Sequence, residues 1–311
     1  MLRVGSLILL LSLTFSLIVT AKPSPATDEE RAQEIIKQAR AAIGGEASIQ
    51  AVQTLRIKGQ YRRILGEREL SGEREVNIML PDKYLAEDEM NPGGLSTAIV
   101  SARGLNGAHA WSGSSGGEGG HMIIRMGTPG GPQATPEQVE AIYHRQHQAE
   151  FTRYLLSILV TPPPSVPVAY KYVGEADVES AHADVVEITG PEKLSFRLFV
   201  DKQTHIPLLL SYRGAKPRIM TAFNRSMDRS AKPDESIKQA RDEAEKKLAT
   251  EPPAKPEEVD FYIRLTDFKK VEGLSLPHKL TFLTGNEVSE EFAIAKYQLN
   301  PQLKADKFQK H

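Results

Sequence analysis

The chain has 311 residues, with 39 Lys and Arg against 40 Asp and Glu, and a formal net charge of −1 at pH 7. A chain this close to neutral is not expected to bind nucleic acid or anionic lipid through bulk positive charge. The absence of cysteine excludes disulfides, thiol nucleophiles and cysteine zinc sites, and an apolar fraction of 40% predicts a packed core.

The first 21 residues have the pattern of a secretory signal peptide. Arg3 supplies a positive start, Val4 to Val19 is almost wholly apolar, and Val19-Thr20-Ala21 fits a small-residue cleavage site. The alternative is an uncleaved membrane anchor, although the apolar run is shorter than the ~20 residues that a spanning helix needs. We therefore predict that residues 1–21 are removed and that residues 22–308 form one exported, periplasmic domain.

In the N-terminal part of that domain, the spacing of apolar residues changes from that of a helix to that of strands. A helix is predicted over Asp28 to Ile43, with acidic residues in its first turn and Gly44-Gly45 at its end. Glu46 to Val52 adds a short helical turn. From Leu55 onward, apolar residues alternate with polar ones and predict strands at 55–62, 76–80, 84–89, 96–102, 108–111 and 121–126.

A second helix opens at Thr135-Pro136 and runs to about Val160, with an apolar face in its C-terminal half. Residues 216–258 form a charged insertion, which we interpret either as a solvated helix over Asp234 to Leu248 or as a disordered loop. Strand patterns stand on both sides of the insertion, at 168–172, 183–189, 194–200, 206–212, 261–265, 279–283 and 290–297.

This order of elements predicts an α+β fold. Strands joined by short turns favour a large curled antiparallel sheet, an incomplete β-barrel of about ten or eleven strands. The sheet packs over the two main helices, and such a pair of layers can leave an apolar cavity between them.

Few residues are spaced for chemistry. His144 and His147 lie at i and i+3 on the second helix, with Glu150 as the best third metal ligand. Exposed helical histidines are the plainer interpretation. The glycine-rich run 113–120 lacks the Gly-Lys-Ser/Thr ending of a phosphate loop and is interpreted as a hairpin loop. We predict no catalytic residue, no cofactor and no metal site.

Several segments, taken in order, resemble the outer-membrane lipoprotein-sorting family of periplasmic carriers, the LolA/LolB type. The strongest match is Phe196 to Pro207, in which a strand ends in a tight turn formed by Asp201 and Thr204. The other matching segments are Ile43-Gly44-Gly45-Glu46, Pro81-Asp82-Lys83-Tyr84, Gly107-Ala108-His109-Ala110-Trp111 and Val271 to Pro277. The resemblance implies an incomplete barrel with an apolar cavity for acyl chains. The arginine that such shuttles use near the cavity has two candidates here, Arg56 and Arg62.

The leading hypothesis is a non-enzymatic periplasmic carrier or binding protein for a lipid or lipidated protein. Its partners would be acyl chains and membrane-associated delivery proteins, without nucleic acid, and the protein would be a monomer. The alternatives are a ligand-free structural or interaction module and an exported hydrolase. Nine residues are candidates for the cavity wall, although plain core is the simpler interpretation for most of them: Tyr61, Ile78, Trp111, Tyr154, Leu155, Phe196, Leu198, Ile263 and Phe282.

Overall fold

The computed structural model describes residues 26–66, 68–90, 98–116, 122–125, 134–216, 220–223 and 257–310. The predicted signal peptide and the segment Asp234 to Leu248 lie outside the described residues. No helix within the described ranges is both long and apolar enough to cross a membrane.

The helices form where their caps and spacing predict them. Helix α1 (Asp28–Ile43) starts with a capping box between Thr27 and Glu30. It ends at Gly44, whose φ of +140° and close approach to Leu274 leave no room for a Cβ atom. Helix α2 (Glu46–Gln50) is a single short turn. Helix α3 (Pro136–Leu159) begins with a second capping box, formed by Thr135 and Gln138, and carries proline in its first turn.

Twelve antiparallel strands form one sheet in the order β5-β4-β3-β2-β1-β14-β13-β12-β10-β9-β8-β7, so β5 and β7 are its two edges. The predicted curled, unclosed antiparallel sheet of the α+β class is confirmed, with more strands than expected. The strands are β1 (Thr54–Leu65), β2 (Arg68–Met79), β3 (Lys83–Met90), β4 (Ile99–Asn106), β5 (His109–Gly116), β7 (Ala169–Val178), β8 (Ala181–Thr189), β9 (Ser195–Asp201), β10 (Pro207–Ala215), β12 (Glu258–Val271), β13 (Leu274–Thr284) and β14 (Glu287–Leu299).

Two short strands form a separate pair. Strand β6 (Met122–Arg125) was expected, and its partner β11 (Met220–Phe223) lies inside the insertion that was interpreted as helix or disorder. Strand β11 was missed because the charges and prolines of residues 216–258 dominate the pattern of that segment. The sheet resumes with β12 at Glu258, which pairs with Ala215 of β10.

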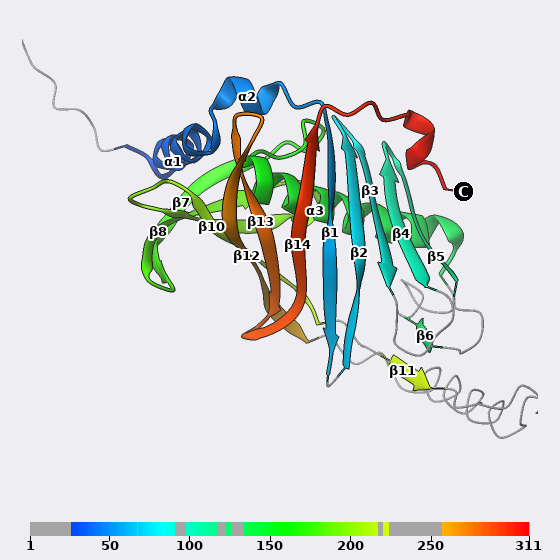
Figure 1. Cartoon of the computed structure of the whole chain (residues 1–311). Helices are drawn as coiled ribbons and strands as arrows, with labels where there is room; N and C mark the ends of the chain where they lie inside the picture. The colour runs from blue at the N-terminus through cyan, green and yellow to red at the C-terminus, as the bar shows by residue number, and fades with distance from the viewer. Residues whose placement is uncertain are drawn as a thin grey trace, which may run out of the picture.

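The sheet curls around α3, which crosses its concave face (Figure 1) and contacts β4, β5, β10 and β13. Helix α1 packs on β7 and β8 and also contacts β13. The main hydrophobic core fills the space between these helices and the sheet. The short helix η2 (Ala305–Phe308) packs against β3 and β4, and its Lys307 pairs with Glu75 and Glu87 on the opposite, convex face.

Candidate functional site

A cluster of ionised side chains is buried on the concave face, between the sheet and α3. Arg74 on β2 and Asp88 on β3 form a two-bond ion pair, with Nε–Oδ1 at 2.5 Å and Nη2–Oδ2 at 2.9 Å. Both side chains are almost fully enclosed, at 2% and 1% exposed. Alternation places Arg74 on the same face as Val76 and Ile78, which belong to the core.

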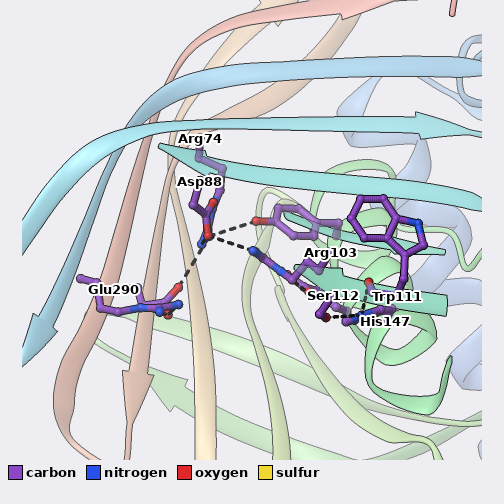
Figure 2. A network of polar contacts seen from close by, with 10 residues as sticks. Arg74, Asp88, Arg103, Trp111, Ser112, His147 and Glu290 are labelled. Atoms are coloured by element: carbon purple, nitrogen blue, oxygen red, sulfur yellow. Dashed lines mark hydrogen bonds and ion pairs between the residues drawn. The ribbon is translucent and has the colours of Figure 1, made fainter. Parts of the chain in front are cut away.

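Arg103 on β4 extends this pair to the helix. Its Nη1 donates to Asp88 Oδ2 at 2.8 Å, and its Nε donates to both carboxylate oxygens of Glu150 on α3 at 2.9 Å. Arg74 also donates to the hydroxyl of Tyr154 on α3, at 3.3 Å. We call Arg74, Asp88, Arg103 and Glu150 the charge network; Figure 2 shows its strand residues between Glu290 and His147. It joins three neighbouring strands to α3 at the wall of the concave face.

The network holds its carboxylates ionised. Burial opposes ionisation of Asp88, but the guanidinium groups of Arg74 and Arg103 outweigh it and hold the pKa of Asp88 well below its usual range. Burial likewise opposes ionisation of Glu150, and Arg103 and Arg153 lower the pKa of this carboxyl. Removal of Asp88 would leave the buried Arg74 with only the 3.6 Å contact to Glu290, and weakening the pairing of a buried charge is costly in a protein interior.

The network continues toward the middle of the sheet. Glu290 on β14 accepts two hydrogen bonds from Arg63 on β1, at 2.9 and 2.7 Å, and its other oxygen lies 3.6 Å from Arg74 Nη1. The Arg74 guanidinium lies 3.6 Å from the centre of the Tyr61 ring. The buried Tyr61 hydroxyl has no hydrogen-bond partner within the described ranges.

Beside these charges lie three half-buried aromatic residues, Tyr212 on β10, Phe261 on β12 and Phe282 on β13. The rings of Tyr212 and Phe261 are stacked with centroids 5.1 Å apart. The register sets Phe282 opposite Glu290 on one side and Ile263 on the other. We call Tyr212, Phe261 and Phe282 the aromatic strip. It gives the concave face an apolar surface that borders directly on buried charge.

The nine predicted cavity residues do not all lie together. Six are enclosed in the main core at 4% exposure or less, namely Ile78, Tyr154, Leu155, Phe196, Leu198 and Ile263. Phe282 is half-buried in the aromatic strip, and Tyr61 packs in a small separate cluster with Leu70 and Met90.

Trp111 lies on the convex face, away from the other eight. Its indole packs over Gly104, where a Cβ atom would meet it at 2.5 Å. Its Nε1 donates to the carbonyl of Phe308 at 3.1 Å. Its neighbour Ser112 points to α3 and contacts His147, so alternation turns Trp111 to the other side. Trp111 therefore anchors η2 and is separated from the concave face by the sheet.

The two predicted cavity arginines are also on the convex face. Arg56 bonds to Asn77 and Gln298, and Arg62 bonds to Glu69 and Glu291. Side chains alternate between the two faces along β1, so Arg56 and Arg62 lie on the same face as Lys58. Arg63 lies on the opposite face, with the core residue Ile57. Near α3, the described arginines on the concave face include Arg63, Arg74 and Arg103 from the sheet and Arg153 from the helix.

His147 is buried, at 4% exposure, so its interpretation as an exposed histidine is wrong. Its Nε2 lies 3.0 Å from Ser112 Oγ and 3.1 Å from the carbonyl oxygen of Trp111. Because a carbonyl only accepts, this geometry assigns the proton to Nε2, and the ring is not placed to take a proton from Ser112. Glu150 is engaged with Arg103, and within the described ranges no three His, Asp or Glu side chains converge as metal ligands.

Two further motifs have structural explanations. Asp201 Oδ1 accepts from the backbone and hydroxyl of Thr204 and from the backbone of Gln203, so the predicted capped turn is confirmed. These bonds lower the pKa of Asp201. The run 113–120 was interpreted as a hairpin loop, which is wrong for residues 113–116 because they continue strand β5. The same run contains a Gly-x-Ser-x-Gly spacing around Ser115. Its residues up to Gly116 lie in edge strand β5 rather than at the strand-to-helix turn that such a serine requires.

We expect the buried His147 to make the fold sensitive to mild acid. Burial lowers its pKa, and the nearby Arg103 and His144 act in the same direction, against Glu150. Below the unfolded pKa of ~6.5 the unfolded chain therefore binds more protons, so stability falls as pH decreases toward the folded pKa. We expect the melting temperature to drop between about pH 7 and pH 5, and to drop less in His147→Gln. His109→Gln, at a side chain that is 83% exposed, should melt like the parent; an identical pH profile for His147→Gln would contradict this role.

The chain is similar in structure to LolA superfamily proteins. A LolA superfamily protein from Nitrosomonas europaea matches 90% of this chain and 97% of its own, with 10% identity and a TM-score of 0.46. A DUF1329 family protein from Desulfovibrio piger matches 91% and 98%, with 10% identity and a TM-score of 0.43. No protein-family model and no curated protein sequence matches the chain.

Proposed function

We propose that the protein is a non-enzymatic carrier or binding protein that holds the acyl chain of a lipid or lipidated protein on the concave face of its sheet. The observation that carries this proposal is the aromatic strip. Tyr212, Phe261 and Phe282 are half-buried, whereas the other apolar residues of the same rows, such as Leu210 and Ile263, are enclosed. The strip is thus a part of the concave face, next to the charge network, with apolar surface left to bury.

The chemistry of the strip suits an acyl chain. Each buried methylene contributes ~0.8 kcal/mol, so a few carbons covered on both sides give useful affinity without hydrogen bonds. Aromatic rings offer large, rigid apolar surface at low entropy cost. Among the predicted cavity residues, Phe282 is the proposed contact. The six enclosed residues shape the wall beneath it.

The predicted signal peptide supports an exported, periplasmic protein. Acyl-chain cargo would come from a membrane or a lipidated protein, so delivery partners at the membrane are part of the proposal. A monomer, as predicted from the sequence, is also part of the proposal. Asp201 is explained by its turn and His147 by its contact with β5, which supports binding rather than catalysis.

The test compares two aromatic residues on opposite faces of the sheet. Phe282→Glu should remain folded, because the half-buried side chain can reach water, but should weaken binding of a fluorescent fatty acid by roughly 10- to 100-fold through lost apolar burial. Tyr262→Glu is the matched control. Tyr262 is also half-buried, but it follows Phe261 on β12 and therefore faces the convex side.

Binding is measured by fluorescence titration and folding by circular dichroism. A parent protein that binds no fatty acid and no other acyl lipid would overturn the carrier proposal. Equal losses in Phe282→Glu and Tyr262→Glu would remove the aromatic strip as the binding surface.

A further inference from the structure

Among the concave-face arginines Arg63, Arg74, Arg103 and Arg153, only Arg153 on α3 makes no ion pair within the described ranges. Its guanidinium carbon lies 4.4 Å from the centre of the Tyr212 ring, over one end of the aromatic strip. Within the described ranges no carboxylate lies at ion-pair distance from it, although Glu150 stands one turn away on the same helix. Glu150 is committed to Arg103 through both of its oxygens.

The cluster as a whole has a positive excess. Arg63, Arg74, Arg103 and Arg153 provide four guanidinium groups, and Asp88, Glu150 and Glu290 provide three carboxylates. Each carboxylate is already bonded to an arginine of the sheet. A half-enclosed positive charge bordered by apolar rings interacts more strongly with an anion than one in bulk water does.

A second arginine–tyrosine contact in the same chain, that of Arg31, differs from the Arg153 contact because its arginine has carboxylate partners. Arg31 on α1 also covers a tyrosine, with its guanidinium carbon 3.6 Å from the centre of the Tyr172 ring. Arg31 is neutralised there by Asp184 at 3.3 Å and Glu175 at 3.5 Å. Arg153 has the aromatic partner without the carboxylates, in the place where the proposed cargo would lie.

We propose that the cargo on the aromatic strip is an anionic amphiphile, whose carboxylate or phosphate headgroup pairs with Arg153. This inference rests on the proposed function and names the chemical class of its ligand. The acyl chain lies over Tyr212, Phe261 and Phe282, and the headgroup supplies the direct ion-pair partner that Arg153 lacks within the described ranges. Guanidinium suits either anion, because its planar donors match two oxygens at once.

The experiment uses the whole chain and three probes of one chain length: palmitate, hexadecyl phosphate and the neutral hexadecanol. Each displaces a neutral fluorescent acyl probe below its aggregation concentration. The parent should bind at least one of the two anions about tenfold more tightly than hexadecanol, as a charge-assisted pair predicts. The tighter of the two anions identifies the carboxylate or the phosphate as the source of the charge.

Arg153→Gln should lose this preference and keep its affinity for hexadecanol, whereas Arg31→Gln should keep both. Arg153→Lys retains the positive charge and should keep part of the preference for anions. It replaces Arg153→Gln as the test variant if the glutamine variant does not fold.

Equal affinity of the parent for hexadecanol and both anions would overturn the inference and leave the carrier proposal standing. Failure of all three probes to bind would overturn both. An unchanged preference in a folded Arg153→Gln would exclude Arg153 as the headgroup contact.

Discussion

Asp88→Asn is expected to lower the free energy of unfolding by about 3–5 kcal/mol. The substitution keeps the shape of the side chain and removes its charge, so the guanidinium groups of Arg74 and Arg103 lose the carboxylate that they share. Arg74 is only 2% exposed in the folded chain, so its charge is poorly solvated once the carboxylate is gone. Urea unfolding at neutral pH measures the effect as a lower midpoint with an unchanged slope.

Asp177→Asn is the matched control. Asp177 pairs with His182 at the surface, and the two side chains are 73% and 81% exposed. Exposed pairs of this kind contribute ~0–1 kcal/mol, so the control should stay near the parent. A loss in Asp88→Asn as small as in the control would show that Asp88 is not ionised in the folded protein.

The same pair predicts how acid acts on the fold. The pKa of Asp88 is depressed in the folded state, so its contribution is present above the unfolded pKa of ~3.9 and is lost as pH falls toward the folded value. Glu75, on the convex face, behaves similarly: Lys58, Asn77 and Lys307 outweigh its burial and lower its pKa to about 2. We expect the parent to lose stability steeply below about pH 4, and Asp88→Asn to lose less over that range.

Much of the fold follows from local patterns in the sequence. Asp28 to Ile43 has both a capping box and a glycine stop, so helix α1 begins and ends where it was predicted. The Asp201 turn needs only residues close in sequence, and its hydrogen bonds are those expected of an Asp-x-x-Thr turn. Strands such as β9 alternate without interruption and were predicted to within a residue or two. In each case the physical cause lies within a few neighbouring residues.

The candidate site depends on contacts between distant residues, and the sequence did not reveal it. Arg74 is separated by two and four residues from the apolar Val76 and Ile78, and this spacing indicated that the arginine faces inward with them. Its pairing with Asp88 and Arg103 depends on strand register, which alternation alone does not specify. Trp111 was grouped with the cavity residues because it is large and apolar. Its neighbours Ala110 and Ser112 face the concave side, so Trp111 between them faces the convex side.

Leu198→Glu is expected to unfold the protein. Leu198 looked like a cavity residue because it lies in a strongly alternating strand, but its side chain is fully enclosed and belongs to the main core. Leu210 and Val186 face it from the neighbouring strands. A carboxylate there has no partner and no water, which costs several kcal/mol out of the ~5–15 kcal/mol that stabilise a typical domain.

Phe199→Glu is the control for Leu198→Glu, because Phe199 follows it on β9, faces the other side of the sheet and is half-buried. In a thermal melt followed by circular dichroism, Leu198→Glu should show no cooperative transition, whereas Phe199→Glu should melt near the parent.

The comparison with Phe282→Glu then locates the binding surface, because that variant should stay folded and lose acyl binding. If Leu198→Glu folds and loses binding instead, water reaches the space beneath β9. The acyl chain would then enter the core between β9 and the helices, and the aromatic strip would be only its entrance.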